Sequence, residues 1–230
     1  MQQVEIFGEI EAVNISYLGN YADRFGSETI TIHNDGRVLR TMIRSVAFWG
    51  YAFDGLSPEE NTSPEKLTSF TLQQGDLCSC IIECDIPTPV EAGKEIIEGR
   101  LHVRLDLGEP ADTGGLDRET LNLSLVVGDT IFAGSGRSGW FEGELEELQS
   151  ALPVGTYIKA CINCAFSDYS PYGHGLFGSM ACFRDNKEEY LSAETKDDIF
   201  RVWDTLTEYV QERYLCPEFQ RRRPGTGYRG

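Results

Sequence analysis

The strict alternation of apolar and polar residues is the feature of this chain that most restricts its fold. In the segment 97–107, Leu101, Val103, Leu105 and Leu107 alternate with polar residues. This period of two is the pattern of a strand with one buried face. The segment 28–32 alternates in the same way. Strands that follow one another with few helices between them predict antiparallel pairing rather than parallel βαβ winding.

Two turn sequences predict where the strands fold back on themselves. Asn34-Asp35-Gly36 separates 28–32 from a run at 38–53 that is rich in β-branched and aromatic residues. Gly128-Asp129 separates 121–127 from 131–133. Asn and Gly tolerate positive φ, so both sites favour tight hairpins.

Helical periodicity is found only in the second half of the chain. Apolar residues from Phe141 to Leu152 recur at steps of four, three and four, which predicts a helix over 140–152 that Ser138 caps. Thr195 is predicted to cap a second helix, reaching about residue 206. The segments 156–166 and 182–191 are predicted to be strands. The predicted fold is therefore α+β: mainly an antiparallel sheet or sandwich, with two helices in the C-terminal half.

A cluster of glycines and a proline at 110–117 suggests a domain boundary. It divides the chain into a β-rich N-terminal domain, 1–110, and an α+β C-terminal domain, 111–230, that holds a cluster of cysteines. One continuous domain is the alternative.

The charge of the chain is strongly acidic. Twenty Lys and Arg against 37 Asp and Glu give a net charge of −17. Residues 1–160 carry 11 basic and 26 acidic side chains, a net of −15. This balance disfavours binding to nucleic acid or to an anionic membrane, and it would steer a basic protein toward the surface. The sequence does not indicate an oligomeric state.

The chain begins without a positively charged segment followed by an apolar one, so no secretory signal is predicted. It has no apolar run near the ~20 residues that a membrane span needs. A cytoplasmic location is therefore expected. Because that compartment is reducing, we do not expect the seven cysteines to form a disulfide framework.

Four cysteines in the last third of the chain predict a metal site. Cys161 and Cys164 form a C-x-x-C pair, and 17 residues separate Cys164 from Cys182. Zinc prefers four tetrahedral ligands and binds thiolates well. Cys216 would be the fourth ligand, although 33 residues lie between it and Cys182. The predicted cofactor is a structural zinc ion held by Cys161, Cys164, Cys182 and Cys216.

Other interpretations of these residues remain open. The four thiols could be buried without a metal, since cysteine is among the most often buried residues. The C-x-x-C pair could be redox-active, although such pairs usually open a helix. His174, in the loop between the second and third cysteines, could replace one thiolate. Three further cysteines, Cys78, Cys80 and Cys84, are predicted to form part of the core.

No P-loop, dinucleotide fingerprint, nucleophile elbow or zinc-protease motif is present. The loop 134–139 resembles a phosphate cradle in composition, but it lacks the Lys-Ser/Thr pair, and the acidic start of the next helix would repel phosphate. Asp168 and His174 are the only candidate site residues for a metal-dependent hydrolase, in which a metal held near them would activate water.

The C-terminal seventy residues resemble an uncharacterised bacterial domain-of-unknown-function family. The resemblance rests on the C-x-x-C pair and the FSDYSP string after it, Cys182, YLCPE at 214–218 and PGTGYRG at 224–230. It covers the β-rich part only loosely. It implies a bacterial, cytoplasmic protein whose four cysteines act as a unit, and it implies no mechanism.

Composition and motifs together predict a non-enzymatic acidic binding protein with a structural four-cysteine zinc site. An immunity or antitoxin-type protein that neutralises a basic toxin is one alternative, because an acidic face would complement such a partner. A metal-dependent hydrolase is the other.

Overall fold

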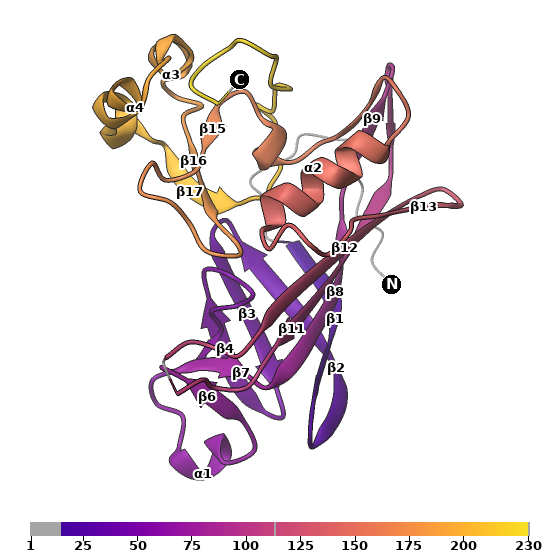
Figure 1. Cartoon of the computed structure of the whole chain (residues 1–230), viewed down its shortest axis with the longest axis vertical. Coiled ribbons are helices and arrows are strands. Elements are labelled where there is room, and N and C mark those ends of the chain that lie inside the picture. Colours follow the sequence, from indigo (N-terminus) through magenta and orange to yellow (C-terminus); the bar gives the residue numbers. More distant parts are fainter. Residues whose placement is uncertain (1–14, 113, 230) are drawn as a thin grey trace.

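The computed structural model of the chain describes residues 15–112 and 114–229, and it is dominated by one nine-stranded antiparallel sheet (Figure 1). In spatial order its strands are β13 (Thr130–Ala133), β12 (Glu119–Val127), β11 (Gly99–Leu107), β8 (Cys80–Pro87), β1 (Ile15–Asp23), β2 (Gly26–Asp35), β3 (Val38–Ile43), β4 (Val46–Gly50) and β5 (Ser57–Pro58).

Smaller elements surround this sheet. The remaining strands are β10 (Glu95–Ile97), β9 (Val90–Ala92) and β14 (Thr156–Ile158) in one sheet, β15 (Ser167–Asp168), β16 (Ser179–Cys182) and β17 (Glu208–Gln211) in a second, and β6 (Thr71–Gln73) and β7 (Asp76–Cys78) in a third. The α-helices are α1 (Pro64–Leu67), α2 (Phe141–Ala151), α3 (Lys187–Ser192) and α4 (Lys196–Val202), and 3-10 turns lie at Cys161–Asn163 and Trp203–Thr205. The predicted α+β class, mainly antiparallel, is confirmed.

The predicted hairpins form, and the backbone shows why. The turn between β2 and β3 contains Gly36 at φ 53°, and the turn between β12 and β13 contains Gly128 at φ 57°. The run 38–53 is not one strand, because Arg44 and Ser45 both adopt positive φ and separate β3 from β4. Two successive residues with positive φ give the tight turn whose twist suits a hairpin.

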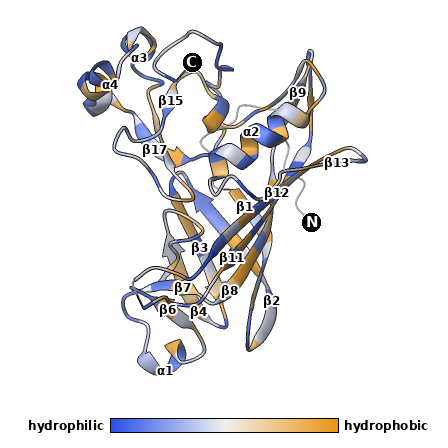
Figure 2. Cartoon of the chain, viewed as in Figure 1, coloured by the Kyte–Doolittle hydropathy of each residue, from blue (hydrophilic) through white to orange (hydrophobic). Residues whose placement is uncertain are grey.

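The large sheet buries one face of nearly every strand. Along β11 the odd-numbered residues from Gly99 to Leu107 are all buried and the residues between them are not. Figure 2 shows hydrophobic and hydrophilic residues interspersed along these strands. Cys80 and Cys84, which share a face of β8, belong to this core, and Cys78 is buried just before them. The prediction that these three cysteines are core residues is confirmed.

Helix α2 lies across the edge of the sheet formed by β12 and β13 (Figure 1). It buries Phe141, Leu145 and Leu148 against the core, as the four-three-four spacing predicts. Ser138 does not cap it. The N-cap residue is Trp140, which makes no side-chain cap, and the Ser138 hydroxyl donates to the Trp140 carbonyl at 2.9 Å.

Two further expectations are changed by the structure, and the suggested domain boundary stays a prediction. That boundary lies between β11 and β12, which pair with each other in the large sheet. The segment 156–166 is a strand only to Ile158 and then becomes a 3-10 turn. The segment 182–191 ends β16 and then enters α3. The strands expected over the last two segments are therefore interrupted by a 3-10 turn and by helix α3.

The helix that begins after Thr195 is confirmed. Thr195 and Asp198 form a reciprocal capping box, in which the Thr195 hydroxyl accepts from the Asp198 N–H and the Asp198 carboxylate accepts from the Thr195 N–H. Among residues 15–112 and 114–229, the helices are all too short or too polar to cross a membrane.

Candidate metal centre

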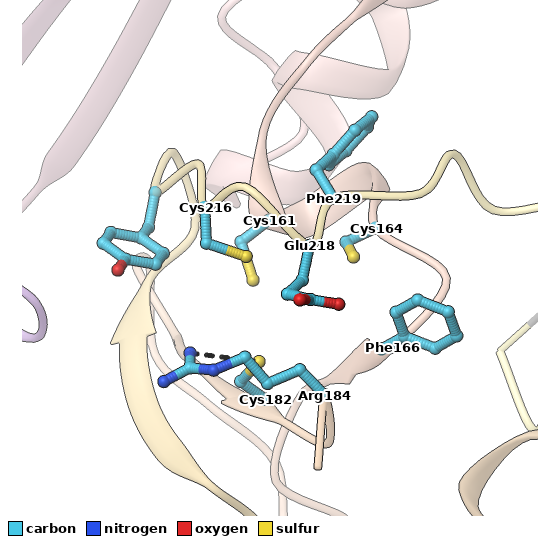
Figure 3. Close-up of a pocket in the computed structure, with 9 residues that line it drawn as sticks. Cys161, Cys164, Phe166, Cys182, Arg184, Cys216, Glu218 and Phe219 are labelled. Carbon is cyan, nitrogen blue, oxygen red and sulfur yellow. Dashed lines mark hydrogen bonds between the residues drawn. The ribbon is translucent and has the colours of Figure 1, made fainter. Parts of the chain in front are cut away.

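All four predicted thiols line one cavity in the C-terminal region (Figure 3). Cys161, Cys164 and Cys182 are buried, and Cys216 is half-buried. In Figure 3, Cys161, Cys164 and Cys216 lie on one side of the cavity and Cys182 lies across from them. The volume open to the centre of a water-sized sphere is about 10 Å³, so the cavity holds about one particle of that size.

The C-x-x-C pair lies on a tight turn. The Cys164 N–H donates to the Cys161 carbonyl at 2.8 Å, closing the 3-10 turn Cys161–Asn163. This turn places two sulfurs at adjacent points of one short loop. The Cys161 N–H in turn donates to the carbonyl of Tyr214, and the Ile162 N–H donates to that of Glu212 at 2.9 Å. The turn is therefore docked on the C-terminal segment.

Cys182 and Cys216 reach the cavity from the neighbouring sheet. Cys182 ends β16, which pairs with β17, and Cys216 follows β17 by five residues. The segment after Cys216 returns along the turn, where the Ala165 N–H donates to the Gln220 carbonyl at 2.7 Å. Backbone pairing, rather than side-chain chemistry, brings the four cysteines together.

Burial raises the pKa of all four thiols, and neighbouring sulfurs add to the rise. For Cys161, the other three cysteines all contribute to the raised pKa. The four groups therefore lie within electrostatic reach of one another.

Backbone N–H groups oppose this rise at three of the four sulfurs. The N–H of Phe166 hydrogen-bonds to Cys164, that of Arg184 to Cys182 and that of Glu218 to Cys216, and each lowers the pKa of its thiol. Each of these donors is two residues after its cysteine, and the N–H of Gln220 is a second backbone donor to Cys164. A repeated donor of this kind stabilises negative charge on the sulfur, which is the form of cysteine that binds metals.

Arg184 supplies a positive charge at the same cavity. Its guanidinium lies 3.8 Å from the Cys182 sulfur and also pairs with Glu208. Four thiolates on a divalent ion carry more negative charge than the ion neutralises, and a guanidinium beside them offsets part of the excess.

The cavity is not itself a formed ligand shell. Within 15–112 and 114–229, no group of three or more His, Cys, Asp or Glu side chains is arranged to hold a metal ion. The thiols converge on one space, and side-chain adjustment would have to bring them to the ~2.3 Å zinc–sulfur distance.

His174 and Asp168 are absent from the lining of this cavity. The His174 ring stacks on Tyr169, with 4.0 Å between ring centroids, and its Nδ1 lies 2.9 Å from the Gly175 carbonyl oxygen. Buried Asp168 accepts hydrogen bonds from the Tyr169 N–H and the Tyr190 hydroxyl. Both residues are held by contacts within the fold.

The glycine-rich loop 134–139 is occupied by a carboxylate of its own chain. Buried Glu144 accepts from the N–H of Gly136 at 2.9 Å and from that of Ser138 at 3.0 Å. The N–H groups that a phosphate would need are therefore already paired. This supports the interpretation that the loop is not a phosphate cradle.

Sequence reasoning missed Glu212, a deeply buried acid of the C-terminal region. It lies just after β17, and both the Tyr169 hydroxyl and the Gly178 N–H donate to its carboxylate. Nothing in the local sequence of β17 and Glu212 distinguishes a buried acid from an exposed one. Only the packing of the loop that carries Tyr169 and Gly178 identifies it.

The fold and the cavity define an antiparallel α+β protein whose C-terminal region gathers four thiols. The chain belongs to DUF6304, a family of unknown function whose model matches residues 15–167. That range covers the large sheet and α2, and of the four thiols it includes only Cys161 and Cys164. The family match thus lies mainly on the β-rich part, whereas the resemblance noted from the sequence rested on the last seventy residues. Neither the curated proteins nor the solved structures contain a match to this chain.

Proposed function

We propose that this protein is a non-enzymatic binding protein whose C-terminal region is held together by a structural zinc ion. Cys161, Cys164, Cys182 and Cys216 would be its ligands. The observation that supports this most is the convergence of all four thiols on one cavity, from segments that are as much as 55 positions apart.

A metal would stabilise the part of the C-terminal region around Cys164, where the apolar cluster is small. The cluster that includes Cys164 contains only Ala165 and Phe166 as further buried residues, with Leu191 and Phe219 packed beside them. Burial of so few apolar side chains contributes little free energy of folding. A zinc ion that joins the turn, the end of β16 and the C-terminal segment would supply the missing cross-link.

The arrangement favours a metal over a redox pair or unrelated thiols. A dithiol needs only Cys161 and Cys164, and it would not account for Cys182 and Cys216 at the same cavity. The repeated N–H donors and the guanidinium of Arg184 are features that stabilise thiolates together. The free state of all seven cysteines fits a reducing compartment such as the cytoplasm.

Metal content tests this proposal directly. Protein purified without added zinc is expected to contain about one equivalent of zinc, and replacement by Co²⁺ is expected to give the intense visible bands of tetrahedral thiolate coordination. Cys216→Ser should abolish these bands. Cys78→Ser is the matched control, because Cys78 is a buried thiol outside the cavity. Less than about a tenth of an equivalent in the wild-type protein would overturn the zinc site.

For the binding partner, we propose a basic protein, on the basis of the net charge of −17. Neutralisation of a basic toxin is one function of this kind, and a toxin gene adjacent to the gene for this protein would favour it. Immobilised protein should retain a basic partner at about 0.15 M salt and release it near about 1 M salt, where surface charges are screened. Absence of any salt-released partner would count against this part of the proposal.

A further inference from the structure

A second cavity lies next to the thiol cavity, and Phe166 lines both. Its volume is about 550 Å³, within the range of small-molecule sites. Its walls come from the C-terminal tail (residues 216–229), the residues just after the cysteine turn, α3 and β9. The lining residues are Glu91, Ala165, Phe166, Leu191, Gln220, Arg221, Arg223 and Thr226.

Three consecutive arginines approach this cavity, and only two face it. The tail is extended here: Cys164 and Arg221 form an antiparallel bridge, and the Arg222 N–H donates to the Asn163 carbonyl at 2.9 Å. Side chains of an extended segment point alternately to opposite sides. Arg222 accordingly points inward, where it donates to the Cys164 carbonyl at 2.8 Å. Arg221 and Arg223 line the cavity and are exposed.

Both of these arginines have guanidinium N–H groups that can donate to a ligand. The Arg221 guanidinium stacks on the Tyr157 ring, 3.7 Å from its centroid, and it lies 3.8 Å from the Glu91 carboxylate. Stacking fixes the plane of a guanidinium and leaves its edge free to donate. Arg223 forms no ion pair within the described part of the chain. Its backbone is held in place, because the Thr226 hydroxyl donates to its carbonyl at 2.6 Å.

We propose that this cavity binds a small organic dianion, a phosphate ester or a dicarboxylate, through Arg221 and Arg223. Guanidinium groups bind both kinds of anion in a bidentate manner. The cavity is far larger than a bare anion, and Leu191 and Ala165 offer an apolar wall for an attached apolar group. Because Glu91 already lies beside Arg221, we expect the anionic group of the ligand to lie closer to Arg223. This inference goes beyond the proposed binding of a basic protein and does not depend on the metal.

Calorimetric titration with two probes tests the site. Phenyl phosphate and benzylmalonate each carry two negative charges on an apolar group, and benzyl alcohol is a neutral control. Saturable binding of at least one dianion is expected, with no binding of the alcohol. Arg223→Ala should weaken binding about tenfold, the loss expected for a charged hydrogen bond, and Arg221→Ala should weaken it less, because Glu91 already lies beside Arg221. Arg223→Lys should weaken it less, since it keeps the charge and loses only the bidentate geometry.

Arg137→Ala is the matched control, because it removes one positive charge from an exposed loop outside the cavity. It is expected to leave both affinities unchanged. Tighter binding of phenyl phosphate would identify a phosphate ester, and tighter binding of benzylmalonate a dicarboxylate; either result supports the site. Absence of saturable binding by both dianions would overturn it, and so would an equal loss in Arg137→Ala.

Discussion

The hydroxyl of Tyr169 donates a 2.6 Å hydrogen bond to the carboxylate of Glu212, and both side chains are buried. Burial raises the pKa of Glu212 to about 8, even though this hydrogen bond and that from Gly178 lower it, and the charges of Asp54 and Glu142 add to the rise. This hydrogen bond attaches the loop 167–179 to the end of β17. It also holds the carboxyl group of Glu212 in a site that is shielded from water.

This burial predicts an unusual pH dependence. Since the pKa of Glu212 in the folded protein is above its ordinary 4.5, the folded state holds a proton that the unfolded state releases. The contribution of Glu212 to stability is therefore complete below pH 4.5 and is lost as the pH rises toward 8. Over that interval the expected loss is about 4 kcal/mol.

Glu212→Gln should remove this loss, because a neutral amide can still accept from Tyr169 and Gly178. Denaturant titration between pH 5 and pH 8 measures the difference between the variant and the wild type. Glu188→Gln, at an exposed position, is the control and should follow the wild-type curve. A Glu212→Gln variant whose stability changes with pH as the wild type does would contradict the prediction.

Glu144 is expected to show the opposite behaviour. Burial raises the pKa of its carboxyl, but the hydrogen bonds from the backbone of Ser138, Gly136 and Arg137 outweigh this and lower it overall. The stability that Glu144 provides is present above its ordinary pKa and is lost as the pH falls through the lowered value.

Replacement of this side chain should also destabilise the protein at neutral pH. Glu144→Gln is expected to cost about 1–3 kcal/mol in the free energy of unfolding, because the loop N–H groups lose a charged acceptor. Exposed Glu146 lies two residues away on the same helix, and Glu146→Gln should change stability by less than about 0.5 kcal/mol. Chemical denaturation at pH 7 compares the two, and equal effects would remove the role given to Glu144.

Arg222 is expected to contribute to stability, whereas its neighbours Arg221 and Arg223 line the second cavity. It donates to the carbonyls of Cys164 and Ser167, so it fixes the backbone between the turn and β15. Arg222→Ala is expected to destabilise the protein by about 1–3 kcal/mol, and Arg223→Ala by less than about 0.5 kcal/mol. Thermal unfolding in phosphate-free buffer measures both. The reverse order would show that the tail does not depend on this inward contact.

Metal removal tests the cavity through the reactivity of its thiols. Burial, with the nearby sulfur of Cys78, raises the pKa of Cys80 to about 12, so this core thiol should stay unreactive in the folded protein. Half-buried Cys216 should become the first thiol to react with a disulfide reagent once a chelator has removed zinc.

The same treatment should lower the melting temperature by roughly 5–10 °C, which corresponds to roughly 3 kcal/mol for a chain of this size. In Cys216→Ser the chelator should have no further effect. Thiol reactivity and a melting temperature that do not respond to the chelator would mean that no metal is bound.

Local sequence patterns were enough to predict the elements that depend on a few adjacent residues. Alternation from Leu101 to Leu107 predicted β11, Gly128 predicted the turn between β12 and β13, and the Thr195 cap predicted the start of α4. These features need only local backbone preferences and the burial of one face. Zinc ligation itself remains a proposal that rests on residue type and spacing.

Which distant residues meet depends on the tertiary structure. It decided that Cys216 lies at the cavity of Cys161, and that Glu212 is buried beneath Tyr169. It also pairs β11 with β12, the strands on either side of the suggested domain boundary. Such contacts depend on how strands far apart in the chain pair and pack against one another. The conformational preferences of neighbouring residues do not determine that pairing.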